Sequence, residues 1–246
     1  MKSWCVIMVC VWISVGCRDD GSDGASGTSQ SENQGSEYAD PGGTGASPAD
    51  LDETFEGVAT YYDADGSGAC MFDADPSDIH VAALTKEQWA SAGWCGACAD
   101  ATGPDGTVRV RIVDQCPGCK HGHLDMHPEA FDQIAARRLG IVDITWQFVS
   151  CDVQGPLRYK YKDGSNPWWT AVQVRNHRRP ILSLEWSADG ATWNTTVRQD
   201  YNYFLAAGGF GEGAVEIRVT SIDGQVIQDK LPPVESELEV QGTDQF

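Results

Sequence analysis

The chain has 246 residues, enough for two modest domains, and its formal net charge is -19 at pH 7. This acidity argues against binding to nucleic acid, whose phosphates require basic side chains, and favours neutral or cationic partners. Nine Trp, seven Tyr and seven Phe are a generous supply of flat apolar faces.

Residues 1–17 are predicted to be an export signal. Lys2 precedes an apolar stretch, residues 4–15, that is too short to span a membrane as a helix. The stretch ends in Ser14-Val15-Gly16-Cys17, which resembles a bacterial lipoprotein cleavage box with Cys17 as the lipidated residue, although Ser14 stands where such boxes have Leu. We expect an extracellular or cell-surface protein, which touches a membrane only through a lipid on Cys17 or else is fully secreted.

Two low-complexity regions and two β-rich domains follow. Residues 18–51 are rich in Gly, Ser, Asp and Glu, so they are predicted to be a disordered acidic linker. Residues 52–153 are predicted to form a first β domain. It contains two short helices, one at the capping pattern that begins with Thr85 and one at residues 128–136, which open with Pro128.

A second β domain is predicted for residues 157–232, after a compositional break near Gly155 and Pro156, and it contains no cysteine. Asp-Gly pairs at residues 163–164, 189–190 and 223–224 are typical of turns between strands. Its predicted strands are residues 157–162, 171–175, 181–186, 215–221 and 226–229. Residues 233–246 are predicted to be an acidic tail.

Residues 108–128 carry the densest set of reactive side chains. The stretch begins as a strand of alternating apolar residues and then places Asp114, two cysteines, three histidines and Asp125 close together in the sequence. Together with CGAC at residues 95–98, the CPGC at residues 116–119 and the nearby histidines form a pattern typical of a zinc site. An even set of six cysteines in an exported β domain is also typical of three disulfides, and export favours them.

Asp114 and Asp125 are the candidate catalytic pair. Two acids in one cleft are the minimal equipment for cleaving a glycosidic bond, with one as general acid and the other as base or nucleophile. Either residue could equally cap a turn or a helix, as Asp often does. Spacing alone leaves both interpretations open.

The motifs together resemble those of one family, the expansins. In the first domain they are EGVATYY at residues 56–62, IVDQCP at 112–117 and HLDMHPEAF at 123–131. In the second they are DGSNPWW at residues 163–169, AVQVRNH at 171–177 and DYNYF at 200–204. The resemblance implies an all-β protein, in which a six-stranded double-psi β-barrel related to glycoside hydrolase family 45 is followed by an immunoglobulin-like β-sandwich that binds carbohydrate.

The resemblance also implies roles for individual residues. The wall-loosening groove would contain Thr60, Asp114 and Asp125, with Asp125 at the place of the hydrolases' catalytic acid and Tyr62 contacting substrate. His127 stands where the family has a capping Ser, which predicts a slightly weaker cap. By analogy the disulfides would join Cys70 with Cys95, Cys98 with Cys151, and Cys116 with Cys119, and the protein would need no metal and no cofactor.

The same resemblance predicts binding without hydrolysis. Family 45 enzymes have a second Asp as base four residues after the Thr, and Ala64 occupies that spacing here. Asp63 and Asp65 flank it, and a loop shift of one residue could bring either into the cleft, although their surroundings are ordinary turn composition. A family 45-like endoglucanase therefore stays an alternative.

The resemblance implies that the second domain binds the polysaccharide. Trp168 and Trp169, with Tyr201, would stack on glucose rings, assisted by Lys162 at the rim. Neighbours on a regular strand point to opposite faces, so both tryptophans face solvent only if the backbone at Pro167 is irregular. Trp186 and Trp193 are predicted to pack in the core or at its edge.

The expected protein is a monomer that binds cellulose and related neutral β-glucans of plant cell walls and separates chains held by noncovalent contacts. Its acidity should limit retention on anionic pectin-like polymers. Two further alternatives are a peptidoglycan-acting protein like rare lipoprotein A, which shares the barrel, and a binding module with an inert barrel.

Overall fold

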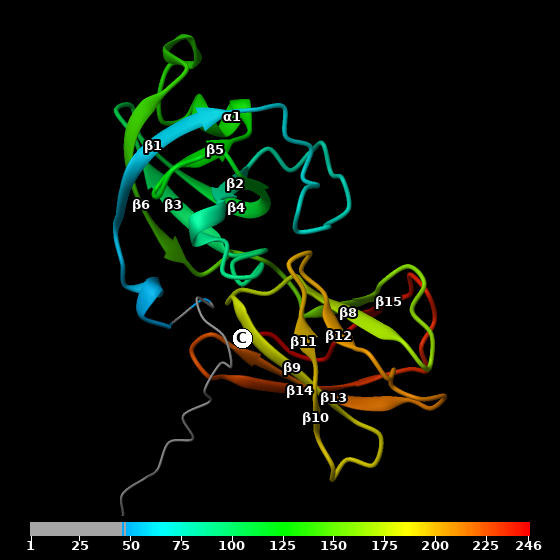
Figure 1. Cartoon of the computed structure of the whole chain (residues 1–246). Coiled ribbons are helices and arrows are strands. Elements are labelled where there is room, and N and C mark those ends of the chain that lie inside the picture. Colours follow the sequence, from blue (N-terminus) through cyan, green and yellow to red (C-terminus); the bar gives the residue numbers. More distant parts are fainter. Residues whose placement is uncertain (1–45, 47) are drawn as a thin grey trace, which may run out of the picture. The chain divides into compact units, whose positions relative to one another are not determined.

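The computed structural model describes Ala46 and residues 48–246. The predicted export signal, Cys17 and most of the predicted linker lie outside these residues. The described chain is built almost entirely from strands and forms a β-barrel followed by two packed sheets (Figure 1). The predicted all-β fold, a six-stranded double-psi barrel followed by a sandwich, is confirmed.

Six strands close the barrel in the order β1-β5-β2-β4-β3-β6. They are β1 (Phe55–Tyr61), β2 (Val81–Thr85), β3 (Cys98–Thr102), β4 (Thr107–Cys116), β5 (Leu124–Met126) and β6 (Val142–Val149). The pairs β1–β5 and β2–β4 are parallel, and the other four pairs of the barrel are antiparallel. In this order, β5 lies between β1 and β2, and the C-terminal end of β4 lies beside β2.

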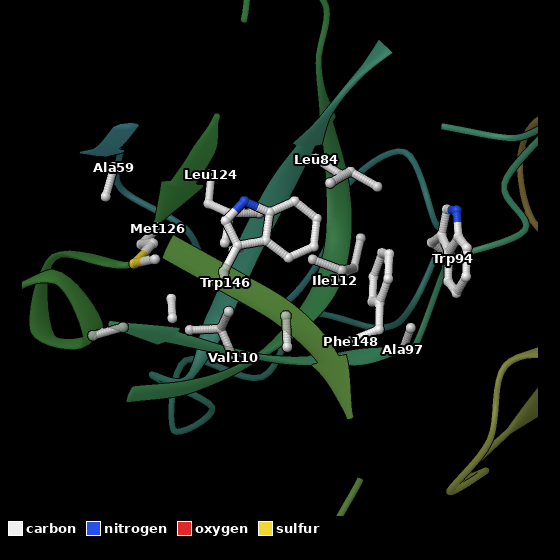
Figure 2. Packing of buried hydrophobic residues seen from close by; sticks show 14 of the residues in the cluster. Ala59, Leu84, Trp94, Ala97, Val110, Ile112, Leu124, Met126, Trp146 and Phe148 are labelled. Atoms are coloured by element: carbon white, nitrogen blue, oxygen red, sulfur yellow. The ribbon is translucent and has the colours of Figure 1, made fainter. Parts of the chain in front are cut away.

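The barrel interior is filled by the inward residues of these strands. In β6, Val142, Ile144, Trp146 and Phe148 are buried and alternate with polar residues, as a half-buried strand requires. Trp146 stacks on Phe55 at a ring distance of 4.3 Å, and Phe148 stacks on Trp94 at 3.8 Å. Figure 2 shows Trp146 and Phe148 extending from β6 into this aromatic and aliphatic cluster.

The predicted linker extends too far toward the barrel. Pro48–Leu51 form a 3₁₀ helix, η1, and Ala46 and Leu51 pack against the barrel core. The composition of residues 18–51 predicts disorder on average, but Leu51 is an apolar side chain with a core within reach. The packed domain therefore begins before residue 52.

Both predicted helices of the first domain are present as short turns. Thr85 caps the 3₁₀ helix η2 (Lys86–Gln88), but Gln88 accepts a hydrogen bond from the Gly122 amide instead of closing a capping box. Helix α1 (Pro128–Phe131) begins with Pro128 and is shorter than predicted. His127 caps α1 through Nδ1, which accepts from the Glu129 amide at 3.1 Å, so the imidazole performs the capping role.

The second domain is a sandwich of two sheets. One has the order β10-β9-β13-β14 and the other β11-β12-β8-β7-β15. The five predicted strands correspond to β7 (Arg158–Tyr161), β8 (Thr170–Arg175), β9 (Ile181–Ser187), β13 (Val215–Ser221) and β14 (Val226–Leu231). The sheets share one apolar core that includes Leu157, Leu184, Phe204 and Ile217.

Four short strands of the sandwich were not predicted. Three of them, β10 (Asn194–Thr195), β11 (Val197–Arg198) and β12 (Phe204–Ala206), lie between the predicted strands. The fourth, β15 (Glu239–Gln241), pairs antiparallel with β7, so the predicted acidic tail of residues 233–246 is wrong in part. Val240 is the one apolar residue of β15, which is too short for a period of two to be visible.

Three disulfides join Cys70 with Cys95, Cys98 with Cys151, and Cys116 with Cys119. This pairing is the one implied by the resemblance, and it leaves no thiolate among these six residues for a zinc ion. None of the helices in the described part of the chain is long and apolar enough to cross a membrane.

Candidate functional site

The register of the barrel places the predicted groove residues in one row across four neighbouring strands. Asp114 of β4 pairs with Ala83 of β2, Ala83 pairs with Asp125 of β5, and Asp125 pairs with Thr60 of β1. Directly paired residues project from the same face of a sheet. We call Thr60, Asp125, Ala83 and Asp114 the polar row.

A β-bulge brings Asp114 into this row. The pairing of β2 with β4 skips Val113, between Ala82–Ile112 and Ala83–Asp114. One extra residue reverses the alternation of a strand, and Ile112 and Val113 are accordingly both fully buried. Asp114 therefore lies half-buried at the surface, on the face opposite to the inward Ile112.

Thr60 is the centre of a three-residue hydrogen-bond network. Its hydroxyl donates to Asp125 Oδ1 at 2.5 Å, and its oxygen lies 2.8 Å from Nε2 of His123. Because the single hydroxyl proton is directed to Asp125, the His123 contact is satisfied when Nε2 carries a proton and donates. His123 is half-buried, and that burial lowers its pKa while the charge of Asp125 opposes the shift.

Sequence reasoning missed His123 as a member of this site. The three histidines at residues 121–127 indicate a metal site only beside free cysteines, and the six cysteines of this domain are paired in disulfides. The signal that could have found His123 is its spacing: it lies two residues before Asp125 and so projects from the same face of an extended chain.

Asp114 is held by backbone donors. Its Oδ1 accepts from the amide of Ala69 at 2.7 Å and from its neighbour Gln115 at 2.8 Å. Gly68, at φ +153°, passes so close that an added Cβ would lie 2.4 Å from the Asp114 carboxyl carbon. The carboxylate of Asp114 thus has one fixed oxygen, and its Oδ2 lies 3.5 Å from the hydroxyl of Tyr62.

Tyr62 stands among three carboxylates. Burial raises the pKa of its hydroxyl well above the ordinary value, and the charges of Asp114, Asp125 and Asp65 raise it further. The phenol therefore keeps its proton and acts as a donor at the polar row. This is the position that the resemblance implied for a substrate-contacting residue.

The two acids flanking Ala64 have different surroundings. Asp63 is exposed. Asp65 is tied within its own turn, because its Oδ1 accepts from the Ser67 amide at 3.0 Å and from the Ser67 hydroxyl at 2.6 Å, and these bonds lower its pKa. Both residues behave as members of a surface turn.

The predicted aromatic residues of the sandwich lie on one sheet. Asn166–Trp169 form the tight turn of the β7–β8 hairpin, where the Asn166 side chain accepts from the amides of Trp168 at 3.0 Å and Trp169 at 3.2 Å. This irregular backbone, predicted at Pro167, leaves Trp168 69% exposed and Trp169 half-buried.

Lys162 and Tyr201 lie beside that hairpin. Lys162 follows β7, and Tyr201 precedes β12, the strand next to β8 in the sheet. The Lys162 ammonium lies 5.9 Å from the centre of the Tyr201 ring, within the range of a cation–π contact. We call Trp168, Trp169 and Tyr201 the aromatic surface.

Gly209 packs directly against this turn, a contact that no sequence pattern predicted. Its φ is +72°, and an added Cβ would lie 2.0 Å from the Pro167 oxygen and 2.5 Å from Trp168 Cα. The turn can adopt its observed position only because residue 209 has no side chain. Trp186 and Trp193 are packed as predicted, on Phe210 at 5.0 Å and under the Arg218 guanidinium at 4.0 Å.

The described residues contain no group of three or more His, Cys, Asp or Glu side chains arranged to hold a metal ion. The polar row offers two carboxylates and the Thr60 hydroxyl, and the Tyr62 hydroxyl and the His123 imidazole lie beside it. Such a set can accept hydrogen bonds from sugar hydroxyls and donate hydrogen bonds to them.

Comparisons with known proteins agree with this architecture. A family model described as lytic transglycolase matches residues 54–146, within the barrel. Expansin-YoaJ of Bacillus subtilis is 34% identical over 189 residues, which are 75% of this chain and 81% of that protein. This chain belongs to the expansin family.

Other expansins align over both domains. Expansin-like protein 1 of Dictyostelium discoideum is 28% identical over 201 residues, 76% of this chain and 70% of that protein. The crystal structure of an apo expansin from Clavibacter michiganensis superposes with a TM-score of 0.73 at 31% identity and covers 78% of this chain and 98% of that chain. A mutant of the same expansin was solved in complex with cellohexaose.

Proposed function

We propose that this expansin binds cellulose through the aromatic surface and loosens it through the polar row without cleaving it. The observation that carries the proposal is that the candidate acid Asp125 is present in the polar row, whereas no carboxylate stands at the spacing of the hydrolases' base. Ala64 occupies the spacing of the hydrolases' base, Asp63 is exposed, and the Asp65 carboxylate is engaged by Ser67. An inverting enzyme needs a second carboxylate roughly 6.5–9.5 Å from the acid, across the substrate.

Loosening would follow from hydrogen bonding alone. The carboxylates of Asp114 and Asp125 accept from glucose hydroxyls. Hydrogen bonds to charged groups contribute about 1.5–3 kcal/mol each. A glucan chain held this way loses lateral hydrogen bonds to its neighbours, which separates the chains.

The substrate class is supported by both the aromatic surface and the relatives. The exposed indole of Trp168 suits the apolar face of a neutral sugar ring, and a mutant of a similar expansin was solved with cellohexaose. We propose neutral β-glucans of plant cell walls as the binding partner of a monomeric protein.

Export is part of the proposal. Six described cysteines are paired as disulfides, which form and persist in oxidising compartments. An extracellular or cell-surface location agrees with this pairing and with a substrate outside the cell. Anchoring through a lipid on Cys17 is proposed from the sequence motif.

One sample tests the proposal. Purified protein is divided between a wall-creep or paper-weakening assay and a reducing-sugar assay on cellulose and soluble glucan. We expect creep without new reducing ends, and loss of creep in Asp125→Asn. Release of sugar ends that Asp125→Asn abolishes would overturn the non-hydrolytic reading.

A hydrolytic second candidate has two specific observations behind it. Asp65 lies in the loop between β1 and β2, and its charge is one of those that raise the pKa of the Tyr62 hydroxyl, which lies 3.5 Å from Asp114 Oδ2. The matched family model is described as lytic transglycolase. Digestion of soluble glucan by the wild type but not by Asp65→Asn would favour an endoglucanase. Release of fragments from purified peptidoglycan would favour a peptidoglycan-acting protein.

A further inference from the structure

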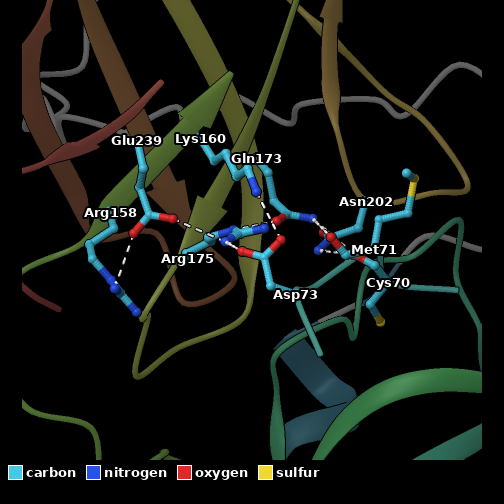
Figure 3. Close-up of polar contacts among 9 residues, drawn as sticks. All are labelled: Cys70, Met71, Asp73, Arg158, Lys160, Gln173, Arg175, Asn202 and Glu239. Carbon is cyan, nitrogen blue, oxygen red and sulfur yellow. Dashed lines mark hydrogen bonds and ion pairs between the residues drawn. The ribbon is translucent and has the colours of Figure 1, made fainter. Parts of the chain in front are cut away.

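The barrel and the sandwich meet at buried hydrogen bonds that converge on one carbonyl group. The oxygen of Cys70, in the barrel, accepts from Gln173 Nε2 at 2.9 Å and from Asn202 Nδ2 at 3.2 Å. Gln173 also lies 3.3 Å from the oxygen of Met71. Figure 3 shows both amides directed at this short segment.

Asp73 continues the same contact three residues later. Its carboxylate bonds to Lys160 at 2.8 Å and to Arg175 at 2.5 Å, both in the sandwich (Figure 3). Arg175 is 91% buried, and it also pairs with Glu239 of β15. A barrel loop is therefore held by two strands of one sheet of the sandwich.

This loop is also part of the polar row's support. The Ala69 amide holds Asp114 Oδ1 at 2.7 Å, and the Cys70 amide donates to the Val113 oxygen at 3.0 Å, next to Asp114. The Cys70–Cys95 disulfide, which is buried, fixes the loop to the barrel. A displacement of Cys70 would reach Asp114 through a single residue.

On the sandwich side, the residues before and after Tyr201 are hydrogen-bonded to the barrel. Asn202 follows Tyr201 and donates to Cys70, and the preceding Asp200 accepts at its backbone oxygen from Trp89 Nε1 of the barrel at 3.2 Å. Asn202 has a φ of +62°, a left-handed conformation that Asn tolerates better than most residues. A residue of the aromatic surface is thus bracketed by two hydrogen bonds to the barrel.

We propose that the segment Ala69–Cys70 couples the polar row to the aromatic surface, with Asn202 and Trp89 as positioning residues for Tyr201. The coupling fixes the spacing between the two surfaces, so both can act on the same glucan. This inference rests on the proposed function and adds to it how force or strain at one surface is transmitted to the other.

Simple adhesion between domains explains the contacts less well. Gln173 is fully buried and Asn202 is 3% exposed, and a buried amide costs free energy unless it is hydrogen-bonded. Apolar side chains would give adhesion at lower cost. Directional bonds to a single carbonyl oxygen specify position instead.

The test uses the full chain and separates adhesion from coupling. Asn202→Gly removes the donor while tolerating the positive φ, and Trp89→Phe removes the indole N–H while keeping most of the ring. Asn194→Ala is the matched control, because Asn194 donates to a carbonyl of its own domain, Trp186, at 3.4 Å. Each protein is assayed below the temperature at which its unfolding begins.

We expect each of the two variants to lose about fivefold in wall creep, the effect of one hydrogen bond, with adsorption to cellulose nearly unchanged. Asn194→Ala should keep both. In addition, cellohexaose should slow amide hydrogen exchange of residues 68–71 in the wild type, and this slowing should be absent in Asn202→Gly. A merely structural role would raise exchange with and without the sugar and leave the slowing intact.

The outcomes are distinguishable. If the wild type neither adsorbs to cellulose nor produces creep, the proposed function fails. If the wild type does both and the two variants match it in creep and in sugar-dependent exchange, the coupling alone is overturned. A loss of creep proportional to a loss of adsorption also overturns the coupling, since it reduces to weaker binding.

Discussion

The polar row and the aromatic surface are built in opposite ways. The polar row is set by strand register, and each of its polar groups is fixed by a hydrogen bond, such as Thr60 to Asp125 and Ala69 to Asp114. Two residues of the aromatic surface, Trp168 and Trp169, lie on a hairpin turn. There Trp168 is mostly exposed, and its backbone amide is held by the Asn166 side chain.

The difference separates two tasks. Directional hydrogen bonds require a rigid site, and the polar row lies on four neighbouring, fully paired strands of a closed barrel. Stacking depends on area and tolerates sliding, so a turn suffices for the aromatic surface. We therefore expect the barrel to determine what is done to the glucan and the sandwich to determine how much protein reaches it.

The largest effect is expected on the barrel side, where Asp125→Ala should reduce wall creep. It removes the acceptor of the Thr60 hydroxyl and a charged acceptor for glucan, and loss of a charged hydrogen bond costs about 1.5–3 kcal/mol, roughly tenfold or more in loosening. Creep and cellulose pull-down are measured on the same preparation. Unchanged creep would show that the barrel is inert.

On the sandwich side, the double variant Trp168→Ala and Trp169→Ala should reduce adsorption to cellulose. Two lost stacking contacts should lower adsorption to cellulose by about tenfold, at roughly 0.5–1.5 kcal/mol for each aromatic contact. Trp193→Ala is the control, because Trp193 packs under Arg218, outside the aromatic surface. Equal losses in the double variant and the control would point to unfolding, which circular dichroism would detect.

Gly209→Ala tests whether the turn itself positions Trp168. A Cβ at residue 209 would collide with the backbone of Pro167, and alanine is strained at the positive φ of this residue, so the turn must move. Adsorption to cellulose should fall by a few-fold, and the free energy of unfolding should fall by about 1 kcal/mol or more. Gly208→Ala is the matched control, since no atom lies within 4 Å of its added Cβ. Isotherms that agree for both variants would contradict the role of the turn.

A smaller effect is expected on titration, because His123 is hydrogen-bonded to Thr60 of the polar row, whereas the aromatic surface contains no histidine. Burial lowers the pKa of His123 below 6.5, so the folded state favours the neutral ring. The resulting stability is present above pH 6.5 and is lost as pH falls through the lowered pKa.

The measurement is the free energy of unfolding against pH for the wild type and His123→Gln. His177, whose pKa is lowered to about 3 by complete burial, contributes a similar slope to both proteins and cancels in the difference. We expect a shallower decline in His123→Gln, and cellulose adsorption that is the same for both proteins across this range. Superimposable stability curves would exclude a role for His123.

The smallest effect concerns the choice of polymer. With a net charge of -19, the protein should be retained less on pectin than on cellulose at low salt, and added salt should narrow the gap because it screens repulsion. Equal retention on both polymers at low salt would remove charge as a source of selectivity.

Much of the fold was predictable because its signals are local. Alternation predicted strands such as β4 and β13, and the resemblance of the motifs predicted the family, its disulfides and a groove containing Thr60, Asp114 and Asp125. What could not be predicted depends on contacts between distant segments. The skipped residue Val113, the close approach of Pro167 to Gly209 and the hydrogen bond of His123 with Thr60 exist only once the strands have paired.

Strand β15 has a practical consequence for anyone who engineers this protein. It covers one edge of β7 and brings Glu239 to Arg158 and to the buried Arg175. Removing residues 239–246 would leave a row of unpaired backbone groups, which is a template for intermolecular pairing and aggregation. Affinity tags and fusion partners should therefore follow residue 246 through a flexible spacer and should not replace the segment before it.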